Sequence, residues 1–249
     1  MNNLDNDTLE LLKALSTVCK RGPIETSLKG SNAVGKLLQE ELGIIHDTKR
    51  RNSFCGFTVT ATARAQSSGR TNLFACVPDW GCSTIKSSTQ HVQTHGKEDR
   101  SRGYSRSMFC TLNSLYPNSF GLYLKANPSQ MQLEEWLDKD GLKQRLLIWD
   151  TTKLLQKLNG LGRSAIVTGL PINLNGSKAY HYRYVQILGK PEPATFFRLL
   201  ADGAITVDHC VSIAEGKKTA REQGPLFKVS SEAREELYGS FQKYDLFDF

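Results

Sequence analysis

The sequence has no long apolar run and no basic, apolar leader. Its apolar stretches, such as 146–149, fall far short of the roughly 20 residues that a membrane-spanning helix needs, which excludes a transmembrane helix. The N-terminus, MNNLDNDTLE, is acidic and polar, whereas a secretory signal begins with basic residues and an apolar core. The sequence therefore predicts a cytoplasmic protein without a membrane partner.

Short catalytic motifs are also missing. The sequence contains no G-x-S-x-G nucleophile elbow, no Walker loop and no H-E-x-x-H zinc motif. The run Gly160-Leu161-Gly162 is too short for a dinucleotide-binding fingerprint. The motifs therefore give no support to a metabolic enzyme.

Cysteine is sparse, with six residues among 249. In a chain of this size without a secretion signal, reduced thiols are expected rather than disulfides. Cys76, Cys82, His91 and His95 are candidates for a zinc site, but five residues separate the two cysteines, whereas zinc-binding pairs are spaced by about two to four. Cys76 also lies in the apolar segment LFACV, so packing is favoured over zinc binding.

The chain does contain an ordinary globular composition with an excess of basic residues. Lys and Arg total 32 against 25 Asp and Glu, a formal charge of +7, and apolar residues make up 39%. A chain of this length buries a sizeable core without disulfides or metals. The basic balance permits a nucleic-acid partner without requiring one.

Hydrophobic periodicity predicts helices at both ends of the chain and strands in its middle. Helices are expected near 1–20, 33–42, 151–158, 194–200 and 231–238, and strands at 57–62, 71–77, 108–112, 121–125, 131–137, 142–149, 164–168, 180–188 and 205–211. The first two strands are expected to pair as a β-hairpin. This order predicts an α/β (α+β) fold, with a mixed sheet flanked by helices, as a single domain over 1–249 or as two packed lobes.

Two basic segments, 97–106 and 214–229, are the strongest functional signals. The second joins two expected strands by a loop. Its charged and amide side chains include Lys217, Lys218, Arg221, Glu222 and Gln223. Lysine neutralises phosphates, whereas Arg and Gln pair with guanine and adenine in the major groove. From spacing alone, a solvated surface loop is the commoner explanation of such a segment.

Four segments carry patterns in a fixed order. Residues 29–44 (KGSNAVGKLLQEELGI) resemble K-G-x-T-G-I-G-x-T-L-E-x-L-L-G-I, and 53–61 (SFCGFTVTA) align without gaps on D-x-x-G-I-E-L-K-A. Residues 71–80 (TNLFACVPDW) resemble T-L-F-x-x-V-P-D-W, and 205–229 resemble a closing strand, recognition loop and strand. Together these segments resemble the MvaI/BcnI-type restriction endonucleases, relatives of the mismatch-repair nickase MutH.

The resemblance implies a fold, an activity and a cofactor. The implied fold is the restriction-endonuclease core, with a catalytic-like part of about 1–125 and a recognition part of about 160–249. The implied activity is Mg²⁺-dependent hydrolysis of a phosphodiester in double-stranded DNA. In that chemistry carboxylates hold the cation and a neighbouring lysine stabilises developing charge.

This chain departs from the family at each of the four catalytic positions. The family Asp, Glu and Lys fall on Ser53, Thr58 and Thr60, and the family's helix Glu falls on Gln39. None of these residues supplies a carboxylate, and a hydroxyl is a poor substitute for an ionised ligand. Either the standard site is lost, or acids elsewhere have replaced it.

Asp47 and Asp79 are the candidates for such a relocated site. Asp47 precedes the strand at 57–62, and Asp79 follows the strand at 71–77, with Lys49 or Arg64 as a cationic partner. The ordinary interpretation of Asp79 is a turn residue after a proline. The metal ligands therefore stay undetermined, with Mg²⁺ expected only if the protein is active.

DNA recognition does not depend on the catalytic positions. By the resemblance and by residue type, the candidate DNA-binding residues are Asp208, Lys217, Lys218, Arg221, Glu222, Gln223 and Lys228. One hypothesis is a monomeric, sequence-specific double-stranded-DNA-binding protein that cleaves DNA through a displaced site. The other is an inactive relative that binds DNA or acts as a regulatory or partner subunit.

Overall fold

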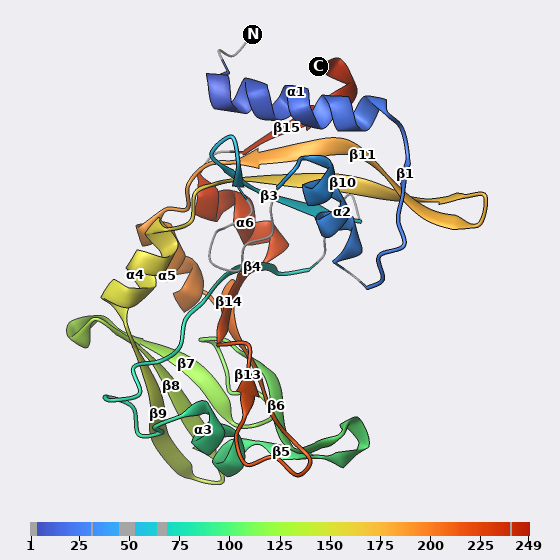
Figure 1. Ribbon diagram of the computed structural model, residues 1–249. Helices are drawn as coiled ribbons and strands as arrows, with labels where there is room; N and C mark the ends of the chain where they lie inside the picture. Colours follow the sequence, from blue (N-terminus) through green and yellow to red (C-terminus); the bar gives the residue numbers. More distant parts are fainter. Residues whose placement is uncertain (1–3, 31, 45–52, 64–68, 240) are drawn as a thin grey trace. The chain divides into compact units, whose positions relative to one another are not determined.

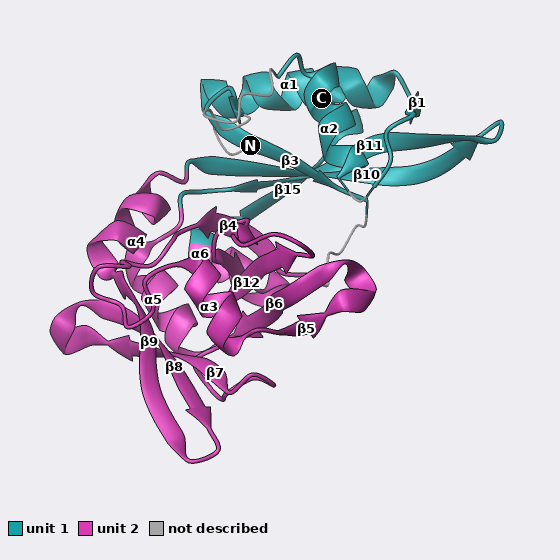
Figure 2. Ribbon diagram, turned by 60° about the horizontal axis from the view of Figure 1, so that its bottom comes forward, with its two compact units in different colours: residues 1–68, 162–190, 238–249 teal, residues 69–161, 191–237 magenta. Residues whose placement is uncertain are grey.

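The computed structural model describes residues 4–30, 32–44, 53–63, 69–239 and 241–249. They form two compact units (Figure 2): unit 1 takes in 1–68, 162–190 and 238–249, and unit 2 takes in 69–161 and 191–237. Each unit therefore combines segments that are far apart in the sequence. The predicted class, a mixed sheet flanked by helices, is confirmed.

Unit 1 is built on a six-stranded sheet with the order β1-β11-β10-β3-β2, and β15 also pairs with β11 (Figure 1). The strands are β1 (Ile24–Glu25), β2 (Ser53–Phe54), β3 (Phe57–Thr62), β10 (Arg163–Leu174), β11 (Ser177–Leu188) and β15 (Phe241–Asp245). The helices are α1 (Asn6–Lys20), α2 (Ala33–Glu41) and the short η3 (Leu246–Asp248). β3 runs parallel to β10, and the other pairs are antiparallel.

The apolar periodicity of the N-terminal region explains the core of unit 1. α1 begins where the Asp5 side chain accepts from the backbone N–H of Thr8, and the chain turns away at Gly22, whose φ is +82°. α1 packs on β11 and α2 packs on β3. Phe57 and Val59 of β3 enter the same core, so the alternating threonines face the other side of the sheet.

The predicted hairpin of 57–62 and 71–77 is wrong. β3 pairs with β2 and β10 in unit 1, whereas β4 (Thr71–Ala75) pairs with β14 in unit 2. Alternation marks a strand but does not name its partner, and a loop longer than a tight primed turn leaves that choice to the rest of the sheet.

Unit 2 contains a six-stranded sheet, β4-β14-β12-β6-β5 with β13 on β12, and a three-stranded sheet, β7-β8-β9. The first sheet comprises β4, β5 (Lys97–Asp99), β6 (Tyr104–Leu112), β12 (Ile205–Ala214), β13 (Arg221–Glu222) and β14 (Leu226–Val229). The second comprises β7 (Leu122–Asn127), β8 (Gln132–Lys139) and β9 (Leu142–Asp150). The helices are α3 (Ser88–His95), η1 (Arg100–Arg102), η2 (Pro128–Gln130), α4 (Thr151–Asn159), α5 (Pro193–Ala201) and α6 (Ser231–Tyr238).

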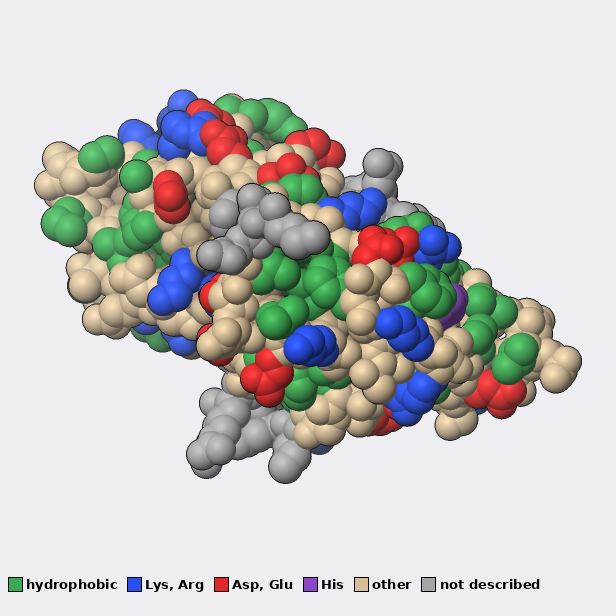
Figure 3. Space-filling model, turned by 90° about the horizontal axis from the view of Figure 1, so that it is seen from above, with side chains coloured by type: hydrophobic (Ala, Val, Ile, Leu, Met, Phe, Trp, Pro, Cys, Tyr) green, Lys and Arg blue, Asp and Glu red, His purple; other side chains and the backbone are tan. Residues whose placement is uncertain are grey.

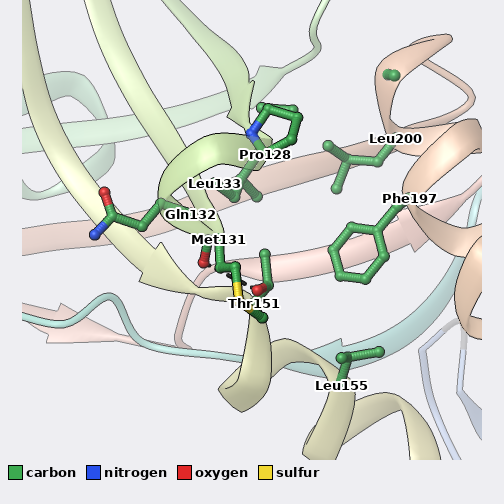
Figure 4. A pocket seen from close by; sticks show the side chains of 10 residues that line it. Pro128, Met131, Gln132, Leu133, Thr151, Leu155, Phe197 and Leu200 are labelled. Atoms are coloured by element: carbon green, nitrogen blue, oxygen red, sulfur yellow. Dashed lines mark hydrogen bonds between the residues drawn. The ribbon is translucent and has the colours of Figure 1, made fainter.

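Aromatic side chains form much of the core of unit 2. The Phe227 ring stacks on Phe74 with 5.0 Å between centroids, and Trp149 meets Phe227 edge-on. An apolar pocket of about 370 Å³ lies in this unit beside β8, α4 and α5, with Met131, Leu155 and Phe197 among its lining residues (Figure 4). None of the helices within the described residues is both long and apolar enough to cross a membrane.

Candidate nucleic-acid interface

Three of the four family-equivalent positions meet on one face of the sheet in unit 1. The register of β2 and β3 sets Ser53 directly opposite Thr58, and Thr60 lies two residues further along the same face. Ser53 and Thr60 are exposed and Thr58 is half-buried. The arrangement therefore keeps the geometry that the resemblance implies, with hydroxyl groups in place of the carboxylates and the lysine.

The fourth position, Gln39, has a structural role. It lies on α2 and is buried, and its Nε2 donates to the carbonyl of Val59 on β3 at 3.0 Å. An amide can donate to this carbonyl, whereas an ionised carboxylate can only accept. The helix and the strand are therefore joined through a group that suits structure rather than metal binding.

These four residues do not fit a Mg²⁺ ion. Mg²⁺ is held in proteins mainly through carboxylate oxygens, and these positions offer none. Within the described residues of unit 1, no three His, Cys, Asp or Glu side chains lie close enough together to hold a metal ion.

The structure describes only one of the two acids considered for a relocated metal site. Asp47 lies outside the described residues and stays a prediction. Asp79, in unit 2, is engaged in a turn: its Oδ1 lies 2.9 Å from Lys153 Nζ, and its Oδ2 accepts from the backbone N–H of Asp150 at 2.8 Å. The backbone carbonyl of Asp79 accepts from the N–H groups of Cys82 and Ser83, as in a turn, while its carboxylate is occupied by these two contacts.

In unit 2, a buried carboxylate organises two cations. Both carboxylate oxygens of Asp208 on β12 accept hydrogen bonds from the Arg70 guanidinium, at 2.5 and 3.0 Å. The Nζ of Lys228 on β14 lies 2.8 Å from Oδ2. The Thr111 hydroxyl on β6 donates to Oδ1 at 2.7 Å. We call these four residues the Asp208 cluster. Burial alone would raise the pKa of Asp208, but its hydrogen bonds to Arg70, Lys228 and Thr111 outweigh burial and lower it.

The Asp208 cluster lies on one face of the β4-β14-β12-β6 sheet, which we call the polar face. The strand pairings place Lys228 beside Thr206, Thr111 beside Asp208, and Arg221 beside Ser212 on this face. The exposed Phe109 shares it and supports the guanidinium of Arg102, which lies 4.8 Å from the ring centre. The sequence indicated Asp208, Arg221 and Lys228 here, and Arg102 as part of the basic segment 97–106, but not Arg70 or Phe109.

The candidate DNA-binding side chains between β12 and β14 do not all lie on the same side of the sheet. Lys217, Lys218 and Gln223 are exposed. The register places Arg221 on the polar face, but sets Glu222 beside Val211 on the opposite face of the sheet. Glu222 is therefore separated from the other candidate DNA-binding side chains.

The excess positive charge is not spread as a continuous basic surface over the molecule. On the face seen in Figure 3, Lys and Arg side chains are interspersed with Asp and Glu. On the polar face the buried carboxylate of Asp208 is paired with two cations, and Arg221 is added on a neighbouring strand.

The rings of His91 and His95 are 5.6 Å apart, but neither Cys76 nor Cys82 joins them in a group that could hold a metal ion. Cys76 is buried and its thiol lies 3.7 Å from its neighbour's carbonyl oxygen, in line with packing, while Cys82 is exposed. His91 instead joins two residues that the sequence did not single out, Glu135 and His209, in a buried group on the side of β12 opposite the polar face. No short motif could have signalled this group, because its members come from α3, β8 and β12.

Comparison with known proteins gives a family from the sequence and a fold from solved structures. The sequence profile described as the MvaI/BcnI restriction endonuclease family matches residues 12–238. The solved structure of the restriction endonuclease MvaI with its cognate DNA substrate is similar with a TM-score of 0.76 and 18% identity, covering 98% of this chain and 100% of that chain. MvaI in the absence of DNA gives a TM-score of 0.56 at 17% identity, covering 99% and 100%. Among curated proteins, none matched.

Proposed function

Because this chain belongs to the MvaI/BcnI restriction endonuclease family, we propose that it binds double-stranded DNA with sequence preference through the polar face of unit 2. The Asp208 cluster is the observation that supports this most directly. One carboxylate holds two cations, which leaves a net positive charge suited to a polyanion. Because Arg70 and Lys228 are already held in place, they lose less side-chain freedom when they bind.

Within this proposal, Arg221 reads bases and the loop lysines contact phosphates. Backbone pairing with Ser212 fixes where Arg221 stands on the polar face, and the planar guanidinium pairs bidentately with guanine. Lys217 and Lys218 are exposed point charges in a turn, which suits phosphate contact. Gln223 adds an exposed amide of the type that pairs with adenine.

We also propose that the protein does not hydrolyse DNA through the four family-equivalent positions. Ser53, Thr58 and Thr60 carry neutral hydroxyls, and the amide of Gln39 is engaged with Val59. No carboxylate there can hold Mg²⁺ or help it activate water. The chain then acts as a DNA-binding relative of the endonucleases rather than as a nuclease through the family's site.

The deciding experiment combines selection and cleavage. Purified protein is incubated with a complex, unmethylated DNA library, with Mg²⁺ and separately with Mn²⁺, and both the retained fragments and any new ends are sequenced. We expect a short motif to be enriched among retained fragments and no new ends. New ends that share one motif, and that are no longer produced by Asp47→Ala, would show that the protein cleaves DNA through a relocated site. Retained fragments without an enriched motif would contradict sequence preference.

Arg221→Ala and Lys217→Ala are expected to act differently on DNA affinity. Loss of Arg221 is expected to reduce discrimination between the selected motif and unrelated DNA by about 1–3 kcal/mol. Loss of Lys217 is expected to weaken binding to all sequences alike, and to reduce the slope of log affinity against log salt by about 0.9 for the lost phosphate contact. Fluorescence anisotropy titrations at several salt concentrations measure both. Equal effects of the two substitutions on discrimination would remove the base-reading role from Arg221.

A further inference from the structure

The group formed by His91, Glu135 and His209 is buried in unit 2, and its members are 0–1% exposed. His91 Nε2 lies 2.9 Å from Glu135 Oε1, and His209 Nε2 lies 2.6 Å from Glu135 Oε2. The available ligand atoms of the three side chains all lie within 4.8 Å of one another. Two imidazoles and a carboxylate from three separate elements thus point to one small volume.

The hydrogen-bond network of this buried group is incomplete. His91 Nε2 and Glu135 Oε1 are in ion-pair contact, yet neither atom makes a hydrogen bond of good geometry. Buried polar atoms are nearly always paired, so this cluster lacks a component that would satisfy it.

The charge of the cluster leads to the same conclusion. Glu135 is completely buried, and the side chains in ion-pair contact with it are two imidazoles rather than Arg or Lys. A buried carboxylate needs a positive partner. A metal cation supplies the charge and leaves both imidazoles neutral.

We propose that His91, Glu135 and His209 bind a Zn²⁺ ion that ties α3 and β8 to β12 beneath the polar face. Imidazole nitrogen and carboxylate oxygen are the ligand types that Zn²⁺ accepts, whereas Mg²⁺ and Ca²⁺ are held by oxygen alone. His95, one turn after His91 on α3 with 5.6 Å between ring centres, offers a further imidazole as a fourth ligand.

The site is inaccessible in the folded chain, so the ion enters as the chain folds. The test therefore unfolds the full chain in denaturant with a chelator, refolds it with Zn²⁺ or Co²⁺, and removes loose metal by gel filtration. Bound zinc is measured by atomic emission, and Co²⁺ by the visible absorption of a tetrahedral ion. This readout does not involve DNA, so it stands whether or not the proposed function holds.

Glu135→Gln has a matched control in Glu134→Gln. Both are buried carboxylates on β8, but Glu134 bonds Asn127, Trp136 and Arg145 instead of the histidines. We expect one zinc ion per chain in the unaltered protein and in Glu134→Gln. Because second-shell changes already lower metal affinity by about 10–100-fold, loss of a direct ligand in Glu135→Gln is expected to lower it by at least about 100-fold.

Folded protein that retains no zinc, or Glu135→Gln and His209→Ala that retain it as fully as Glu134→Gln, would overturn the proposal. Circular dichroism reports whether each variant has folded. If Glu135→Gln fails to fold, the Co²⁺ spectrum of the unaltered chain decides: tetrahedral bands at one equivalent support the site, and their absence overturns it.

Discussion

Asp208→Ala is expected to lower the free energy of unfolding by about 3 kcal/mol, the lower end of the range for breaking a buried ion pair. The substitution leaves Arg70 and Lys228 facing each other without the carboxylate, and it leaves the Thr111 hydroxyl without its acceptor. The low end applies because the Arg70 side chain keeps 35% of its surface in contact with solvent. Urea unfolding followed by circular dichroism measures the change.

Asp202→Ala is the matched control for this experiment. Asp202 also pairs with an arginine, Arg198, at 3.0 Å, but both side chains are about half exposed. An exposed pair of this kind contributes about 0–1 kcal/mol. If Asp208→Ala costs no more than Asp202→Ala, the Asp208 cluster is not the organising element described above.

The effect of Asp208→Ala should also depend on pH in one direction. The folded-state pKa of Asp208 is lower than its ordinary value of 3.8. Its contribution to stability is therefore fully present above that value, and is lost as the pH falls through the folded-state pKa. The difference in unfolding free energy between the two proteins should be constant near neutral pH and should shrink in acid.

Gln39→Glu is the second substitution with a large expected effect. It restores the residue type that the family carries on this helix, but places a carboxylate against the carbonyl of Val59 in a buried position. A carboxylate cannot donate to that carbonyl, and an unpaired buried charge is strongly disfavoured. We expect the free energy of unfolding to fall by about 3 kcal/mol or more at neutral pH.

Two control substitutions, Gln39→Met and Glu40→Gln, separate the effect of the buried charge from the loss of the hydrogen bond and from a change of charge on the helix surface. Gln39→Met keeps the length of the side chain without charge, so it should cost only the lost hydrogen bond and the orphaned carbonyl, about 1–3 kcal/mol. Glu40→Gln changes an exposed neighbour and should have little effect. A stable Gln39→Glu protein that gains Mg²⁺ affinity in calorimetry would show that the position still belongs to a metal site, against the proposed inactivity.

The helix and strand pattern was predicted well because it depends on neighbours in the sequence. The apolar spacing of Leu11, Leu12 and Leu15 requires a helix, and the alternation of Phe57 to Thr62 requires a strand, whatever lies across from them. The same alternation also put Thr58 and Thr60 on one face. Strand partners were not predicted equally well, as the failed hairpin shows, because pairing depends on distant segments.

The sequence by itself determined the main helices and strands, although not β5 or β15, together with the family and the loss of carboxylates at Ser53, Thr58, Thr60 and Gln39. Each of these depends on residue type, order and local spacing. Only the tertiary structure decided which distant side chains meet. Arg70 reaches Asp208 across 138 positions, and His209 reaches Glu135 across 74. Such contacts are set by sheet register, which turns adjacent residues such as Asp208 and His209 to opposite faces, one toward two cations and one into a buried group.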